Sequence, residues 1–181
     1  MSATAALIAS TLNAGTPLLL AGIGILIHER SGVLNLGIEG IMLMGAVAGF
    51  GTCYLTGSFF LGFAAAALVG MVLSALFGFL TLGLYANQNA AGLAMAIFGA
   101  GLAAFIGQPL QGVSLAARAC EGIPFLRDIP FVGDAFFSSH VLVYVTLFMA
   151  GAAACFLYKS RWGLILRAAG ESPKSAYALG Y

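Results

Sequence analysis

The stretch FFLGFAAAAL, residues 59–68, decides the fold of this chain. All of its residues are apolar, so a helix built from it is hydrophobic on every face, as helices in lipid are. Strands of a membrane barrel alternate apolar and polar residues, so the pattern excludes a barrel. The stretch belongs to a longer run, residues 40–117, that contains no Asp, Glu, Lys or Arg.

The composition of the whole chain indicates the same class of protein. Of its 181 residues 61% are hydrophobic and only 7% are charged, whereas an ordinary soluble domain has roughly 25% charged residues. A cytosolic enzyme is therefore excluded, and a net charge of +1 excludes a nucleic-acid-binding surface. The three cysteines predict neither a disulfide framework nor a metal cluster.

The uncharged runs place the membrane spans, because a helix needs about 20 residues to cross the hydrocarbon core. We predict an all-α, polytopic membrane helix bundle with five to six spans. Five of them fall at residues 5–27, 40–56, 59–84, 91–107 and 140–158. A cleaved signal peptide is the alternative for residues 1–27, but no basic residue precedes the apolar stretch. Small residues spaced four apart predict close packing of helices within the bundle.

The charges near the end of the chain predict its orientation. Residues 159–181 carry Lys159, Arg161, Arg167 and Lys174 against Glu171 alone, and the positive-inside rule places such a segment in the cytoplasm. Residues 108–139 are then outside and the turn at 85–90 is inside. The side of the N-terminus stays open, because it depends on whether residues 28–39 count as a crossing.

A charged island, HERSGVLNLGIEG at residues 28–40, interrupts the first apolar runs. Its glycines and Asn35 disfavour a continuous helix, and two arrangements fit. One is a turn between two full spans, and the other is a broken helix over 28–39 of the kind that lines transport pathways. Glu29 and Arg30 could neutralise local charges, and the start of the next helix would favour Glu39.

A short helix is predicted near the end of the chain. Ser172 followed by Pro173 is typical of an N-cap and a first helical position. Ala176 and Leu179 would lie on one side, with Tyr177 or Gly180 beside them, which is too little apolar area for a helix that is stable alone. Packing on its own bundle or on a partner protein would order it; the alternative is a linker to a later span.

The chain has no catalytic constellation and no phosphate-binding loop.

Three motifs resemble permease subunits of bacterial ABC importers for simple sugars and nucleosides, within the ribose and branched-chain amino-acid permease group. The first is ERSGVLNLGIEG at residues 29–40. The second joins Ala86-Asn87 to GLA at 92–94, with Gln88 in place of an acidic residue. The third, Gly163 with RAAGESP at 167–173, is similar to the cytoplasmic coupling loop. Members of that family are longer, so the chain is expected to be the N-terminal portion of one.

The resemblance implies a single transmembrane permease domain over residues 1–181, incomplete at its C-terminus, with a coupling loop at 159–181. It implies a multi-pass protein of the bacterial inner membrane that translocates a nucleoside or a simple sugar. The implied partners are an ATPase subunit, a second permease subunit and an extracytoplasmic substrate-binding protein. The lipid bilayer surrounds the chain, ATP is hydrolysed by the partner rather than by this chain, and no cofactor or nucleic acid is expected.

The resemblance also implies two groups of site residues. Those of the signature motifs would line or brace the translocation path: Glu29, Arg30, Gly32, Asn35, Gly37, Glu39, Gly40 and Asn87. Those of the coupling motif would meet the ATPase: Arg167, Gly170, Glu171, Ser172, Pro173, Ala176 and Leu179.

Two other classes of function remain as alternatives. An ATP-independent secondary transporter or channel would need ionisable residues within its spans, and most of the predicted spans have none. A membrane scaffold or an intramembrane enzyme would leave the motif at 160–181 unexplained, and the enzyme would also need a polar catalytic set.

Overall fold

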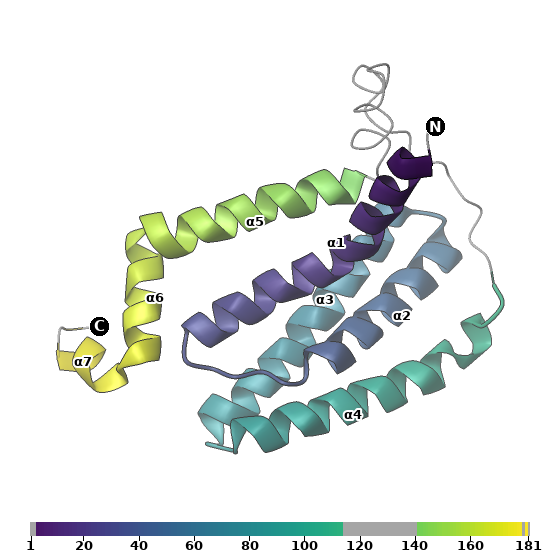
Figure 1. Cartoon of the computed structure of the whole chain (residues 1–181). Helices are drawn as coiled ribbons and strands as arrows, with labels where there is room; N and C mark the ends of the chain where they lie inside the picture. The colour runs from purple at the N-terminus through teal and green to yellow at the C-terminus, as the bar shows by residue number, and fades with distance from the viewer. Residues whose placement is uncertain (1–2, 114–140, 179, 181) are drawn as a thin grey trace. The chain divides into compact units, whose positions relative to one another are not determined.

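A computed structural model describes residues 3–113, 141–178 and 180 of the chain, and every regular element in these ranges is helical (Figure 1). The chain divides into two compact units: Met1–Gly32 with Ala117–Tyr181, and Val33–Ala116. The elements are α1 (Ala3–Arg30), α2 (Ile38–Thr56), α3 (Phe59–Gly78), the π-helix η1 (Phe79–Gly83), α4 (Gln88–Gly107), the 3-10 helix η2 (Gln108–Leu110), α5 (Val141–Lys159), α6 (Arg161–Glu171) and α7 (Pro173–Ala178).

Five helical stretches are long and apolar enough to cross a membrane: Ser10–Arg30, Ile38–Thr56, Phe59–Gly83, Gln88–Leu110 and Leu142–Lys159. They confirm the five placed spans, with ends that move by a few residues. The first helix extends further than predicted, because its charged residues His28, Glu29 and Arg30 form its last turn. The predicted external stretch 108–139 lies outside the described residues from 114 onward.

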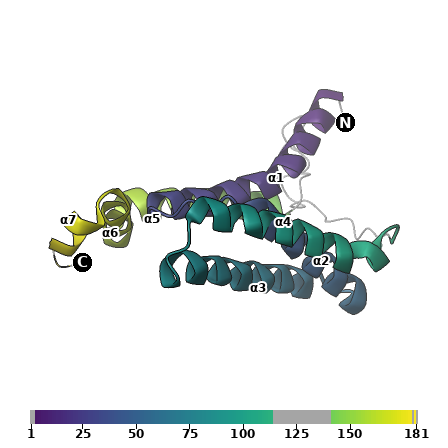
Figure 2. The same ribbon diagram turned by 90° about the horizontal axis from the view of Figure 1, so that it is seen from below.

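The unit Val33–Ala116 is built on α2, which packs against both α3 and α4 (Figure 2). Its buried core is formed by Ile41, Met44, Leu73, Phe77, Met95 and Ala103. A turn separates α2 from α3, between the predicted spans 40–56 and 59–84. Gly57 ends α2 in the left-handed conformation, with φ of 67°, and Ser58 caps α3 by accepting from the N–H of Leu61.

Glycines set the spacing of these three helices. A Cβ at Gly62 of α3 would lie 2.8 Å from the carbonyl oxygen of Gly49 in α2. A Cβ at Gly99 of α4 would lie 2.6 Å from the Cα of Gly40 in α2. The backbones thus touch directly, as small residues permit in membrane helices. The small residues of the sequence pattern therefore pack within the bundle, as predicted.

In the other unit, α1 packs against α5 and α6. At the junction of α5 and α6 the chain turns sharply (Figure 1). Ser160 fixes that turn: its hydroxyl donates to the carbonyl oxygen of Phe156 at 2.6 Å and accepts from the N–H of Gly163 at 2.9 Å. Gly163 packs on the backbone of α5, since its Cβ would lie 2.7 Å from the Cα of Leu157. The start of α6 is therefore held firmly on the end of α5.

Candidate functional site

The first motif forms the connection between α1 and α2. The α1 helix ends at Arg30, and the hydroxyl of Ser31 donates to the carbonyl oxygen of His28 at 2.7 Å. Gly32 has φ of 81°, and its N–H donates to the carbonyl oxygen of Glu29 at 3.0 Å. The predicted interruption is thus limited to residues 31–37. Because α1 and α2 are each long enough to cross a membrane, this favours a turn between two full spans over one broken helix.

Inside this connection, Asn35 shapes the backbone that leads into α2. Only 5% of Asn35 is exposed, and its Oδ1 accepts from the N–H of Gly37 at 2.8 Å. Its buried Nδ2 has no hydrogen-bond partner among the described residues. Gly37 lies against α4, where its Cβ would be 2.8 Å from the Cβ of Met95. These two motif residues hold the chain close to α4.

The charged members of the first motif lie on its surface. Glu29, Arg30 and Glu39 are all exposed, and Glu39 stands in the first turn of α2, where a negative charge is favoured. Gly40, by contrast, is buried against α4. The acidic and basic residues of the motif are therefore exposed, whereas Asn35, Gly37 and Gly40 are buried.

The second motif meets the first through a hydrogen bond that the sequence does not reveal. The Oε1 of Gln88, in the first turn of α4, accepts from the N–H of Leu34 at 2.8 Å. A carboxylate at this position could accept the same bond. Asn87 caps α4, because its Oδ1 accepts from the N–H groups of Asn89 and Ala90 at 3.0 and 3.2 Å.

The third motif forms α6 and α7, and the predicted start of the short helix is confirmed. The hydroxyl of Ser172 accepts from the N–H of Ser175 at 3.4 Å, and Pro173 is the first residue of α7. Ala176 is buried, with 4% exposed, so α7 packs on its own unit. Leu179 lies outside the described residues.

The outward side of α7 was missed in the sequence reasoning. Lys174 and Tyr177 are exposed, and 83% of Tyr177 is accessible. They are three residues apart, and residues with this spacing lie on the same face of a helix. Once Ser172 marks the start of the helix, the sequence therefore predicts that Lys174 and Tyr177 share a face. Glu171 at the end of α6 is exposed as well.

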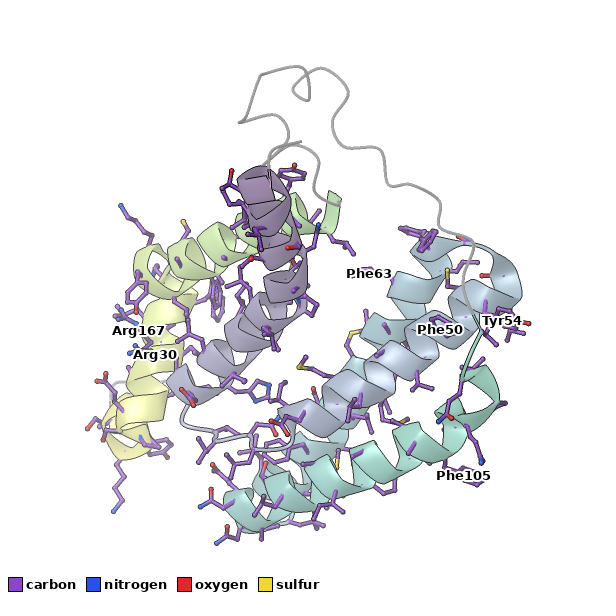
Figure 3. The ribbon with its side chains drawn as sticks, turned by 45° about the vertical axis from the view of Figure 1, so that its right-hand side comes forward. Arg30, Phe50, Tyr54, Phe63, Phe105 and Arg167 are labelled. Carbon is purple, nitrogen blue, oxygen red and sulfur yellow. The ribbon has the colours of Figure 1, made fainter. Side chains whose placement is uncertain are left out.

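Arg167 and Gly170 lie on the part of α6 that faces the rest of the unit. The guanidinium of Arg167 stacks over the ring of Tyr158 in α5, with Cζ 5.0 Å from the centroid, and its Nε is buried. Gly170 packs against the end of α1, where its Cβ would overlap the carbonyl oxygen of Arg30. In Figure 3, Arg30 and Arg167 accordingly lie at the same end of the unit.

Comparison with known proteins agrees with the three motifs. Residues 7–181 match the model of the family described as branched-chain amino acid transport system / permease component. The permease protein TsgC13 of Haloferax volcanii, whose name provisionally assigns it to a glucose ABC transporter, is 41% identical over 99% of this chain. The nucleoside ABC transporter permease protein NupC of Lactococcus lactis is 32% identical over 96% of the chain.

The guanosine ABC transporter permease protein NupQ of Bacillus subtilis is 34% identical, also over 96% of the chain. The chain spans 56% of the first of these relatives and 58% of the other two. No solved structure matches the chain significantly. With almost its whole length matched, and with relatives of this similarity, the chain belongs to the permease family of branched-chain amino acid transport systems.

Proposed function

We propose that this chain is part of the transmembrane permease of an ATP-binding cassette importer, and that the solute is a nucleoside or a simple sugar. The observation that carries the proposal is α7, a capped short helix that packs on α6, with Ala176 buried, in the unit that contains α1 and α5. It presents Lys174 and Tyr177 outward, as a docking element for another protein would. The names of the relatives, for glucose and nucleosides, support the class of solute.

The orientation rests on the position of the basic residues, and two routes back along the chain from them give the same side for the end of α1. The basic residues around α6 and α7 place that end of the bundle in the cytoplasm. Gly170 of α6 contacts Arg30 and Gly32, so the end of α1 is cytoplasmic too. Counting spans back from α5 through α4, α3 and α2 supports the same side for residues 31–37. The start of α1 is then outside.

This orientation assigns the partners to the two faces of the membrane. The ATPase subunit docks on α7 from the cytoplasm, with Glu171, Lys174 and Tyr177 as the exposed contacts and Ser172 and Pro173 as the fixed start of the docking helix. A second permease subunit completes the pathway. The substrate-binding protein delivers solute on the external side. ATP hydrolysis belongs to the ATPase subunit.

The signature residues act as a brace at the cytoplasmic end of the pathway. Asn35 and Gly37 fold the connection against α4, Gly40 lets α2 approach α4, and Asn87 fixes the start of α4. Exposed Glu29, Arg30 and Glu39 give this end a charged surface. Solute would pass beside the brace rather than bind to a single residue of it.

The test is the retention of the ATPase on the full-length protein that carries this sequence. Deletion of residues 172–181 is expected to abolish uptake and the co-purification of the ATPase in mild detergent, with membrane insertion intact. Tyr177→Ala is expected to weaken retention of the ATPase, because it removes the most exposed large side chain of α7. Tyr54→Ala, which removes a half-exposed tyrosine of α2, is the matched control and should retain it.

Two results would contradict the proposal. One is normal uptake by the deletion variant. The other is a folded, full-length protein that never carries an ATPase and whose uptake is lost on addition of a proton ionophore while cellular ATP is retained. The second result would favour the ATP-independent secondary transporter.

A further inference from the structure

The end of α6 and the end of α1 meet through two glycines. A Cβ at Gly170 would overlap the carbonyl oxygen of Arg30 and would lie 2.8 Å from the nitrogen of Gly32. In the other direction, a Cβ at Gly32 would lie 3.0 Å from the Cα of Gly170 and 3.1 Å from its carbonyl oxygen. Since the atoms on both sides are backbone, no side chain can rotate away to relieve a larger residue. We call this contact the Gly32–Gly170 joint.

On one side, a single residue connects the helix that carries Gly170 to α7. Ser172 alone separates the last residue of α6, Glu171, from Pro173, the first residue of α7. The N–H of Ser172 donates to the carbonyl oxygen of Ala168 at 3.0 Å, and its own carbonyl oxygen accepts from Ala176 at 3.0 Å. A displacement of α7 must therefore displace the end of α6.

On the other side, the joint is connected firmly to α1. The N–H of Ser31 donates to the carbonyl oxygens of Ile27 and His28 at 3.1 and 3.0 Å, and Gly32 donates back to Glu29. Gly32 thus has two roles. Its backbone, with φ of 81°, ends α1, and its lack of a side chain allows Gly170 to contact that backbone directly. Any residue that cannot adopt a positive φ would disturb the end of the helix as well as the contact.

The far end of α6 is fixed as well. Gly163 packs on the backbone of α5, and the guanidinium of Arg167 stacks on Tyr158. The α6 helix therefore contacts α5 at its start and α1 at its end.

We infer that the Gly32–Gly170 joint transmits the movement of α7 to the transmembrane helix α1. Gly32 and Gly170 are positioning residues, and their contact links the signature motif to the coupling motif. The inference rests on the proposed function, because an ATPase acting on α7 must supply the movement. It adds the route by which that movement enters the membrane bundle.

The test is the response of α1 to ATP in the complete transporter. Thr11→Cys, near the outer end of α1, is placed in a full-length protein whose Cys53, Cys120 and Cys155 are replaced by alanine. The labelling rate of this cysteine with a water-soluble thiol reagent is measured with and without ATP and magnesium. In this parent we expect a change of about fivefold or more, because coupling between two sites typically shifts a two-state equilibrium by at least that much.

Two variants break the joint in different ways. Gly170→Ala introduces the Cβ that meets the end of α1. Gly32→Asn keeps a residue that tolerates positive φ and adds only the steric contact. In both variants we expect the ATP effect on Thr11→Cys to disappear while the ATPase still co-purifies, because α7 is unchanged.

Each variant has a matched control in open space. Gly151→Ala in α5 and Gly57→Asn, at φ of 67°, have no atoms within 4 Å of the added Cβ. Both should keep the full ATP effect.

An undiminished ATP effect in both joint variants would overturn the inference, and so would a parent that binds the ATPase but shows no effect of ATP at Thr11→Cys. If both joint variants fail to assemble while their controls assemble, the contact serves folding and the inference also falls. Absence of the ATPase from the parent complex would overturn the proposed function itself.

Discussion

At the scale of single residues, the glycines that touch another backbone are the most sensitive positions of the unit Val33–Ala116. Gly99 of α4 faces Gly40 of α2, and the Cβ of an alanine at Gly99 would lie 2.6 Å from three backbone atoms of Gly40. Gly101, two residues further along α4, has nothing within 4 Å of its Cβ position. The same substitution at these two sites therefore separates packing from helix propensity.

We predict that Gly99→Ala lowers the stability of the protein by a net amount of up to about 2 kcal/mol, because overpacking usually costs about 1–3 kcal/mol. The preference of a helix for alanine over glycine, about 1 kcal/mol, offsets only part of this cost, because the neighbour is backbone. Gly101→Ala should be neutral or stabilising. Thermal unfolding in detergent checks both variants, and equal midpoints would contradict the prediction.

At the scale of the element, the start of α4 shows how a local signal and a distant contact combine. Asn87 caps the helix through two N–H groups, which is a local interaction that its sequence position allows one to predict. Gln88 accepts from Leu34, which lies 54 residues earlier. The cap fixes where α4 begins, and the Gln88 bond fixes the first motif against that beginning.

We predict that Asn87→Ala destabilises the protein by about 1 kcal/mol, because two N–H groups of the first turn lose their acceptor. Asn89→Ala is the control, since Asn89 is exposed and lies inside the helix, where alanine is favoured. The two variants are compared by thermal unfolding. A loss of stability in Asn89→Ala as large as in Asn87→Ala would show that the cap is not the cause.

At the scale of the whole molecule, the exposed apolar surface and the position of the charges define a membrane protein. Large exposed side chains, Tyr54, Phe63 and Phe105 among them, lie on helices that are long and apolar enough to cross a membrane, where lipid can cover them (Figure 3). Between residues 40 and 113 the described chain contains no Asp, Glu, Lys or Arg. Neither α3 nor α4 would therefore bury a charged side chain in the hydrocarbon core if it crosses the membrane.

We predict the sidedness of three exposed positions from the order of the spans. In a cysteine-free protein, Thr56→Cys at the end of α2 should react with a membrane-impermeant thiol reagent in intact cells. Asn89→Cys and Lys174→Cys should react only after permeabilisation, because two spans, α4 and α5, separate them and return the chain to the same side. The order would be contradicted if, in intact cells, the reagent labelled the Asn89→Cys variant but not the Lys174→Cys variant.

The sequence by itself determined the features that depend on local pattern. Uncharged apolar runs located the five spans, since a bilayer sets their length. Side chains that cap helices located the start of α7 at Ser172 and Pro173. The motifs identified the permease family, which the family match over residues 7–181 shows. It left open whether residues 28–39 formed a turn or a broken helix.

Only the tertiary structure decided which of these segments meet. It closed α1 at Gly32, limited the interruption to residues 31–37, and brought Gly170 to Gly32 and Gln88 to Leu34. The contacts of Gly170 with Gly32 and of Gln88 with Leu34 join residues that are far apart in sequence. At Gly32 and Gly170 the touching atoms are backbone, so no side-chain pattern in the sequence predicts that they meet. Their physical basis is the close approach of whole helices, which depends on packing rather than on local preference.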